Sequence, residues 1–420
     1  MSRGKEAQRR AGVAQGLVLS FVTSLPILAT ISVAPAIPHL IEQFGHVDDA
    51  TVLVPMLLSV PAIFIAITSP FVGIPIRRFG RKAVLLAGVA LYGAFGLAPF
   101  FMDNLHAILV TRAGLGAAQA MVITVGNALI GDYFTGEPRQ RWVGYQNAIN
   151  AALATSMWFV GGLLASYSWQ SPFLLYIVAI PLIAAVVLLI WEPAPSDDDA
   201  GAADSGASPF PWRRMVVVYC VTMFAASMFF AYPTQIARAF AELGVATPIM
   251  IGVLTAIASL GAPLGALVFS RATTISIPVI LGTALAFVGL PHIGIGLATD
   301  PYVATGIGFF QQMGTGAVGA ALATWCIRSL PFEHRGQGVG IWGTFMVSGI
   351  FISPLLFAVI EGFTGTVQNG FVVMGAVCAA SALVIPTIIR RTVPAEFIGA
   401  SAIGAGPPRE DAPPAETAPE

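Results

Sequence analysis

Arg112 lies in the middle of a long apolar stretch, between Leu109-Val110-Thr111 and Ala113-Gly114. A charge at the centre of a membrane-spanning helix costs about 2.5–3.5 kcal/mol on insertion scales, so we expect its side chain to face a wet cavity or a partner. It could bind a substrate or take part in a proton relay. It could also be a structural hub that ties helices together through backbone carbonyls. We favour the first interpretation, because charges inside membranes usually serve function.

Uncharged polar side chains recur in the same kind of segment. Asn147 and Asn150 are one helical turn apart and would share a face. Gln312 follows Arg112 by 200 residues, at what would be the mirror position of a duplicated chain. Such amides could line a binding site or only hydrogen-bond between helices, a contribution of about 0.6 kcal/mol each. With two tryptophans as an apolar, stacking surface, the predicted substrate path is Arg112, Gln119, Asn147, Asn150, Gln311, Gln312, Trp158 and Trp342.

Other chemistry has little support in the sequence. The three cysteines lie in apolar stretches and are expected to be small core residues rather than disulfides or metal ligands. The G-x-G-x-x-G of Gly314–Gly319 follows no strand, and no G-x-x-x-x-G-K-[ST] motif occurs. No Ser/His/Asp or Cys/His arrangement stands out. We therefore expect no enzyme activity, no cofactor and no metal.

The composition explains where these residues must lie. Hydrophobic residues make up 56% of the 420 residues and charged residues 10%, against about 25% charged in soluble domains. A helix needs about 20 apolar residues to cross a bilayer, and a barrel would show short alternating segments instead. The sequence predicts an all-α membrane protein with twelve spans: 15–38, 51–76, 83–101, 105–131, 143–166, 171–191, 215–237, 247–270, 276–298, 302–327, 338–360 and 369–389.

The chain is a duplication. Glu137-Pro-Arg139-Gln-Arg-Trp-Val-Gly144 resembles Glu333-His-Arg335-Gly-Gln-Gly-Val-Gly340, 196 residues later (333 − 137), and we expect both copies to be loops between spans. Duplicated transporters hold their substrate between the two repeats, near the bilayer midplane. The expected organisation is a cytoplasmic N-terminus (1–11), a six-helix bundle (12–191), a cytoplasmic linker (192–211), a second six-helix bundle (212–391) and a disordered cytoplasmic tail (392–420).

The basic residues fix the expected orientation. If both termini are cytoplasmic, all 20 lysines and arginines except Arg112 and Arg238 fall on the cytoplasmic side, as the positive-inside rule requires. We expect a monomer in the plasma (inner) membrane. Its partners would be lipid, a small-molecule substrate and, if transport is coupled, protons. The net charge of −1 gives no reason to expect nucleic acid.

Residues 73–82, Gly-Ile-Pro-Ile-Arg-Arg-Phe-Gly-Arg-Lys, resemble the G-x-L-a-D-r-x-G-r-k signature of the major facilitator superfamily, with Arg77 in place of the family's Asp. That Asp helps to hold the halves together in the family's outward-open state. Arg112 with Gly116, and Trp158 with Gly161-Gly162, are similar to parts of two drug–proton antiporter motifs. The resemblance implies the twelve-helix fold in two pseudo-symmetric bundles, and we add a pairing of Arg81 with Asp132. The candidate gating residues are Gly73, Arg77, Arg78, Gly80, Arg81, Asp132, Glu137, Arg139, Glu333 and Arg335.

The resemblance is closest to efflux permeases, so we expect export of an amphiphilic or aromatic compound by alternating access. Uptake of a sugar or an organic acid is the alternative, with Arg112 holding the carboxylate. A receptor would need a sizeable soluble signalling domain, whereas the longest polar stretch is a tail of about 30 residues. A channel would differ in turning over far faster. No acidic residue lies in mid-span and arginine titrates above about pH 12, so proton coupling and plain facilitation both stay open.

Overall fold

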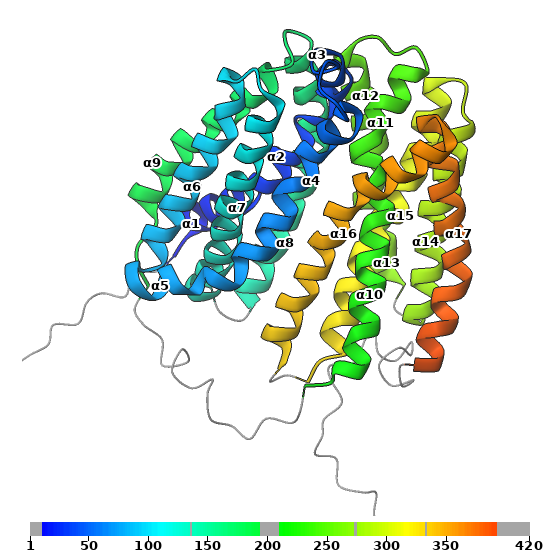
Figure 1. The fold of residues 1–420 in the computed structure, drawn as a ribbon. Helices are drawn as coiled ribbons and strands as arrows, with labels where there is room; N and C mark the ends of the chain where they lie inside the picture. Colours follow the sequence, from blue (N-terminus) through cyan, green and yellow to red (C-terminus); the bar gives the residue numbers. More distant parts are fainter. Residues whose placement is uncertain (1–10, 135–136, 194–209, 273–274, 332–333, 393–420) are drawn as a thin grey trace, which may run out of the picture.

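Helices form all the regular structure in the described part of the chain. The computed structural model describes residues 11–134, 137–193, 210–272, 275–331 and 334–392, and no strand occurs among them. Residues 13–189 gather in one bundle and residues 212–392 in a second bundle beside it (Figure 1). The expected all-helical class is confirmed. Residues 1–10, most of the linker and the tail from residue 393 lie outside the described residues.

The bounds of the elements follow the expected spans closely. The first bundle contains α1 (Val13–Thr23), α2 (Leu25–Ile31), η1 (Ala34–Ala36), α3 (Ile37–Gln43), α4 (Ala50–Thr68), η2 (Ser69–Phe71), α5 (Gly73–Phe79), α6 (Arg81–Leu97), η3 (Ala98–Phe101), α7 (Leu105–Tyr133), α8 (Glu137–Ala165), η4 (Ser171–Val178) and α9 (Ala179–Leu189). The second contains α10 (Trp212–Phe229), α11 (Ala231–Glu242), α12 (Pro248–Ser259), α13 (Gly261–Arg271), α14 (Ile277–Leu297), α15 (Pro301–Arg328), α16 (Arg335–Thr364) and α17 (Val367–Thr392).

Length and apolar character qualify eleven membrane spans among the described residues. The remaining expected span is α15, which has 28 residues and packs against α13 and α14. It carries Gln311, Gln312 and several glycines and threonines, which make it less apolar than its neighbours. Large apolar side chains cover the outer faces of the bundles, among them Val110, Leu188 and Phe363, which are 72%, 80% and 89% exposed. In a bilayer these side chains would contact lipid.

Prolines break several spans in two. Proline cannot donate a backbone hydrogen bond, and its ring crowds the carbonyl of the residue four positions earlier. Span seven is interrupted at Phe230, three residues before Pro233, which separates α10 from α11. Span eight is interrupted at Leu260, three residues before Pro263, which separates α12 from α13. Pro233 and Pro263 therefore account for the breaks in these two spans.

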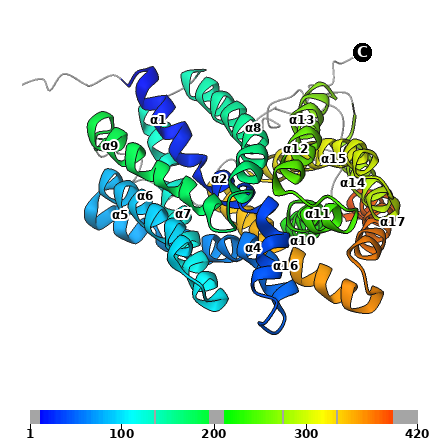
Figure 2. The same cartoon turned by 90° about the horizontal axis from the view of Figure 1, so that it is seen from above.

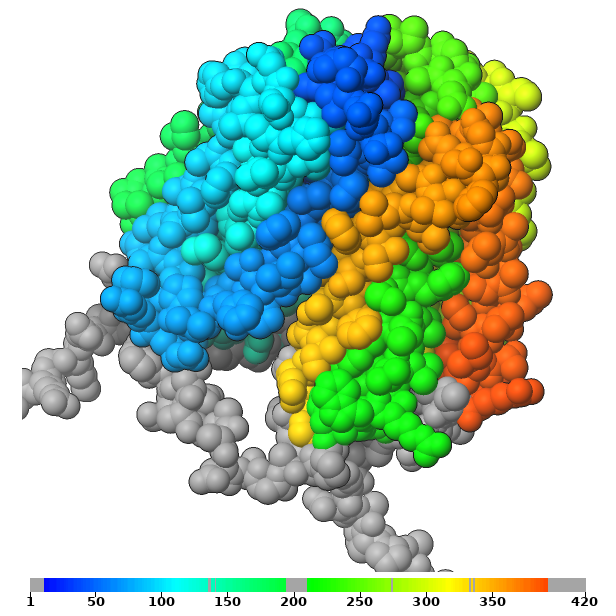
Figure 3. Space-filling model, in the orientation of Figure 1, coloured from blue at the N-terminus to red at the C-terminus, as the bar shows by residue number. Residues whose placement is uncertain are grey.

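The bundles contact each other mainly on the side away from the linker. We call the face where α9 ends and α10 begins the linker side. Of the two parts of span eight, α12 packs against α8, and of the two parts of span seven, α11 packs against α3, η1 and α4. The view from above shows α2, α4, α8, α11, α12 and α16 around the line between the bundles (Figure 2). The surface shows the bundles in contact over its upper part and diverging toward its lower edge, the linker side (Figure 3).

Glycines allow the closest of these contacts. Gly162 of α8 and Gly252 of α12 lie against each other, so that a Cβ atom on Gly252 would meet Trp158 O and Gly162 Cα. A Cβ atom on Gly162 would meet Pro248 O and Gly252 Cα. Substitution of either glycine would therefore force the two backbones apart.

One local expectation is wrong. The repeated segments were expected to be loops, but residues 137–144 form the first turns of α8, and residues from Arg335 form the first turns of α16. Glu137, with Pro138 directly after it, is favourable at a helix N-terminus, because an acidic side chain complements the helix dipole and proline needs no hydrogen-bond partner there. Glu333 lies outside the described residues, as do the side-chain surroundings of Arg335.

Candidate functional site

A cavity of about 570 Å³ lies between the two bundles. Its walls come from α2, α4, α7 and α8 on one side and from α10 to α13, α15 and α16 on the other. Such a volume is typical of sites for small molecules. Because the two bundles share the walls, a ligand in the cavity would contact both.

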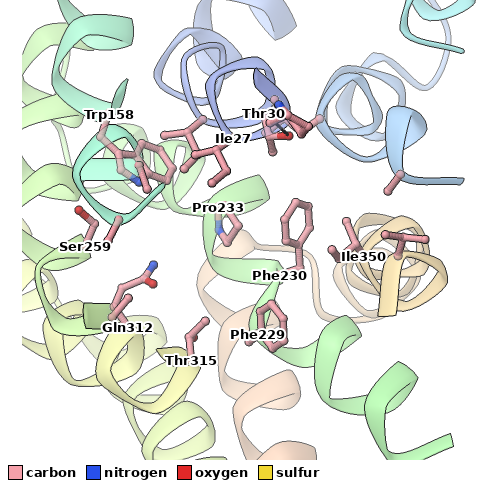
Figure 4. Close-up of a pocket in the computed structure, with 18 of the residues that line it drawn as sticks. Ile27, Thr30, Trp158, Phe229, Phe230, Pro233, Ser259, Gln312, Thr315 and Ile350 are labelled. Carbon is pink, nitrogen blue, oxygen red and sulfur yellow. Dashed lines mark hydrogen bonds between the residues drawn. The ribbon is translucent and has the colours of Figure 1, made fainter. Parts of the chain in front are cut away.

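Among the described residues, the lining is mostly apolar and carries no charged side chain. Its aromatic members are Trp158, Phe229 and Phe230, and four prolines also line it. In Figure 4, Trp158 and Phe230 project into the space from opposite bundles, while Pro233 lies between them. The full set is Pro26, Ile27, Thr30, Ile31, Leu58, Pro61, Ala62, Ile65, Gln119, Ile123, Ala151, Ala154, Thr155, Trp158, Phe229, Phe230, Pro233, Ser259, Ala262, Pro263, Ala266, Gln312, Thr315, Val347 and Ile350.

The polar groups of the cavity are hydroxyls and carboxamides. The Ser259 hydroxyl donates a 3.1 Å hydrogen bond to Thr155 Oγ1 and thereby joins the bundles. Gln312 extends into the space beside Ser259 and Thr315 (Figure 4). Gln119 is 1% exposed, and its Nε2 has no hydrogen-bond partner among the described residues. Gln119, Gln312 and Trp158 are therefore the residues of the predicted path that the structure brings to one cavity.

Arg112 lies elsewhere, inside the first bundle. Its side chain is 1% exposed and is not part of the cavity lining. Nη1 donates to the Tyr176 hydroxyl at 2.9 Å, and Nη2 donates to Phe95 O at 3.0 Å and to Gly96 O at 3.2 Å. The guanidinium also lies 5.2 Å from the centre of the Phe173 ring. This geometry corresponds to the structural hub, the second of the two interpretations of Arg112.

The sequence explains why α6 offers these carbonyls. Phe95 and Gly96 belong to the last turn of α6, where carbonyls lack helical partners and the helix dipole favours a cation. Pro99, four residues after Phe95, has no N–H to give to that carbonyl. Gly96 lets the Tyr176 ring approach, because a Cβ atom there would collide with it. The Tyr176 hydroxyl in turn donates to Ala29 O of α2 at 3.2 Å, so Arg112 supports a helix that lines the cavity.

The N-terminal caps of α7 and α15 do not support the expected correspondence of Arg112 with Gln312 in the two repeats. Asn104 and Asp300 cap the N-termini of α7 and α15 with their side-chain oxygens, and they are 196 residues apart (300 − 104). This offset equals that of the repeated segment. It places Gly308 opposite Arg112 and Thr315 opposite Gln119, and the latter two both line the cavity.

The other predicted path residues lie outside the cavity, and two of them, Asn150 and Trp342, join helices by hydrogen bonds. Asn150 Oδ1 accepts a hydrogen bond from Ser24 Oγ, and Asn147 is exposed on α8 outside the cavity lining. Gln311 is buried and donates from Nε2 to Thr315 Oγ1 at 3.2 Å. Trp342 Nε1 donates to Thr222 Oγ1 of α10 at 2.9 Å. None of the four lines the cavity.

The candidate gating residues form a cluster on the linker side of the first bundle. Arg81 forms an ion pair with Asp132, as expected. Arg77 and Arg78 are exposed on α5, and Arg78 lies over the Phe79 ring. Gly73 begins α5, and Gly80 joins α5 to α6 with a φ of 83°, a conformation that favours glycine. These residues connect parts of one bundle.

The remaining loop residues have local partners. Glu137 pairs with Arg141 one turn along α8 at 2.6 Å. Arg139 is exposed on the same helix, beside Gly131 of α7. Sequence reasoning missed Glu192, whose carboxylate accepts hydrogen bonds from the backbone N–H groups of Arg81 (2.6 Å) and Lys82 (2.8 Å) and so caps α6. It also missed Phe230 as a cavity residue.

Comparisons with known proteins agree with this arrangement. Residues 19–354 match the sequence model of the family described as "Major Facilitator Superfamily". A 3-(3-hydroxy-phenyl)propionate transporter of Escherichia coli is 36% identical over 121 residues, 28% of this chain and 28% of that protein. Multidrug resistance protein 2 of Bacillus subtilis is 29% identical over 169 residues, 40% of each chain. The matched segments thus span less than half the length of these relatives.

Solved structures show the same fold. A bacterial homolog of the human lysosomal transporter Spinster, in an inward-facing and occupied conformation, superposes with a TM-score of 0.71 at 14% sequence identity. The superposition covers 90% of this chain and 96% of that one. Because the family match extends across both bundles and the fold agrees with it, this chain belongs to the Major Facilitator Superfamily, whose members are membrane transporters rather than enzymes.

Proposed function

We propose that the protein is a secondary transporter that exports an amphiphilic or aromatic small molecule across the plasma membrane, with both termini in the cytoplasm. The observation that carries this proposal is the cavity itself: it is shared by both bundles, walled by Trp158, Phe229 and Phe230, and free of charged residues. Apolar and aromatic walls with a few neutral polar groups favour ligands of the same character.

The alternative, uptake of an organic acid, has less support. A carboxylate buried in this cavity would need a cation or several donors to offset its desolvation. Arg112, the residue expected to supply that charge, is not part of the cavity lining, and its two Nη atoms donate to Tyr176 and to two backbone carbonyls. The named relatives do not decide the direction, since one is named for a transported aromatic acid and the other for multidrug resistance.

Two carboxylates are the candidates for any coupling to protons. Asp132 pairs with Arg81, and Glu361 pairs with Arg238, in both cases at the end of a span and outside the cavity lining. Protonation of either carboxylate would remove its ion pair. Coupling would therefore act through the packing of the bundles and not by direct contact with the substrate.

Vesicle transport tests the proposal. Inside-out membrane vesicles that contain the protein are expected to accumulate labelled chloramphenicol, an uncharged aromatic amide, when a pH gradient is imposed, with a rate that saturates with concentration, and vesicles without the protein are the control. Accumulation of labelled benzoate by right-side-out vesicles, with no movement of chloramphenicol, would reverse the direction and the substrate class. A flux that does not saturate would indicate a channel.

A further inference from the structure

The carboxamide of Gln119 is the most unusual polar group in the cavity wall. It lies on α7, is 1% exposed, and lines the cavity, yet its Nε2 has no hydrogen-bond partner among the described residues. Leaving a buried donor unpaired costs about 1–3 kcal/mol. Buried polar groups are nearly always paired, so this one needs a partner that the described chain does not supply.

A second carboxamide faces the same space from the other bundle. Gln312 of α15 lines the cavity and makes no hydrogen bond with the described residues around it. Its neighbour Gln311 is buried away from the cavity, where its Nε2 donates to Thr315 and its Oε1 has no partner among the described residues. The two cavity carboxamides therefore differ from the other amides of the predicted path, none of which lines the cavity.

The helix breaks add acceptors at the same place. Pro233 and Pro263 both line the cavity, and each leaves the carbonyl four residues earlier, on Phe229 and Ser259, without its helical donor. Irregular backbone at membrane depth is tolerated where it lines a cavity. The second bundle thus has two carbonyls without a helical donor on residues that line the cavity, while the first bundle offers the donor of Gln119.

We propose that the substrate is an uncharged aromatic compound with a carbonyl or a similar hydrogen-bond acceptor. Gln119 of the first bundle donates a hydrogen bond to that acceptor, while Gln312 of the second bundle hydrogen-bonds to the polar edge of the same compound. The aromatic body would lie against Trp158 and Phe230, which project from opposite bundles (Figure 4). An uncharged ligand fits because no described lining residue carries a charge that could balance one. This inference rests on the proposed function and narrows its substrate class.

Two neutral fluorescent dyes test the inference. Nile red carries a ring carbonyl, whereas N-phenyl-1-naphthylamine is an aromatic amine without one. Binding of each would be measured to the full protein in nanodiscs, corrected with empty nanodiscs. Gln119→Leu is expected to weaken Nile red binding by about two- to tenfold, the range for one neutral hydrogen bond. It should leave binding of N-phenyl-1-naphthylamine unchanged or tighter, because an unpaired donor is removed.

Matched variants on α15 control for general damage. Gln312→Leu should weaken Nile red binding by a similar factor, while Gln311→Leu, one residue away but outside the cavity, should not. Thermal melting of each variant separates misfolding from lost affinity. Wild-type affinity for Nile red in a folded Gln119→Leu protein would overturn the donor subsite while leaving the proposed export intact. Failure of the wild-type protein to bind either dye would overturn the proposed aromatic substrate class, and this inference with it.

Discussion

The contrast between Arg112 and Gln119 shows how a side chain's role follows from its partners. Both lie on α7, and both are 1% exposed. Arg112 makes three hydrogen bonds within the first bundle through its two Nη atoms, while its buried Nε has no partner among the described residues, so its charge joins α6, α7 and η4 away from the cavity. Gln119 has an unpaired amide in the wall of the cavity. The neutral residue is therefore the better candidate for contact with substrate.

This assignment predicts a specific phenotype for Arg112→Lys. A lysine carries a single ammonium and cannot reproduce the planar fork that reaches Tyr176, Phe95 O and Gly96 O together. Loss of two bonds to a charged donor should cost about 3 kcal/mol or more, seen as a lower melting temperature of the purified protein. Nile red affinity of the folded variant should stay within about threefold of wild type, since Arg112 can affect the cavity only indirectly, through small shifts of α2 and of its own helix α7. Normal melting with tenfold weaker binding would show instead that Arg112 contacts the substrate.

A second residue-scale prediction concerns Arg238 and Glu361. Arg238 of α11 makes two hydrogen bonds to Glu361 of α16, at 2.8 and 2.6 Å, and a third to Gln235 at 2.9 Å. Their side chains are only 10% and 22% exposed, so a single charge reversal leaves two like charges in a poorly hydrated place. Either reversal should lower the free energy of unfolding by about 2 kcal/mol, which is measured as a lower melting temperature. The double exchange, Arg238→Glu with Glu361→Arg, should restore most of it, and equal damage in the double variant would show that the pair itself is unimportant.

At the scale of elements, the contact of α8 with α12 holds the bundles together on the side away from the linker. Gly162 and Gly252 are the residues that let the two backbones meet. Ala at either position should separate the helices there and shift the protein toward a form open on that side, because interlocked helix faces have discrete arrangements. Spin labels at Asp48 and Thr247, on the two bundles, should report a longer distance. Gly144→Ala on the same α8 is the matched control, since a Cβ atom there would contact nothing within 4 Å. An unchanged distance in both glycine variants would contradict this role.

The cap of α6 is a further element-scale feature. Glu192 accepts from the first two N–H groups of α6, directly after Gly80 in its positive-φ conformation. Removing a side-chain cap costs typically about 1 kcal/mol. Glu192→Ala should therefore lower the melting temperature by a few degrees, while the Nile red affinity stays unchanged because the cap is remote from the cavity lining. A melting temperature equal to wild type would show that water satisfies these N–H groups equally well.

On the scale of the whole molecule, the sequence predicted the architecture better than the site. Apolar runs of about 20 residues define helices in any membrane context, and Pro233 indicates its break by covalent chemistry alone. Arg81 and Asp132 could be paired because both lie at span ends on the same side. The partners of Arg112 could not be predicted, because two of them are carbonyls left without helical donors at the end of another helix. Glu192 was likewise hidden, since its acceptor role depends on how the chain folds back from α9 to α6.

The asymmetry of contacts between the bundles leads to a last prediction about the whole molecule. The bundles pack through α8 with α12 and through α4 with α16, and of the divided spans seven and eight it is α11 and α12, rather than α10 and α13, that pack against the first bundle, so the cavity should open toward the linker side. The proposed orientation places that side in the cytoplasm. A cysteine replacing Thr315 in a cysteine-free background should then react with a charged, impermeant maleimide from the cytoplasmic face. Inside-out vesicles should be labelled at least about tenfold faster than right-side-out vesicles, since the protein can open on the other side only when the α8–α12 contact separates.

Nile red should slow the labelling by occupying the cavity, and a cysteine replacing Asp48 should show the opposite preference. Faster labelling of the Thr315 position in right-side-out vesicles would mean that the protein rests open to the outside or lies in the membrane with the opposite orientation, and the Asp48 variant distinguishes the two.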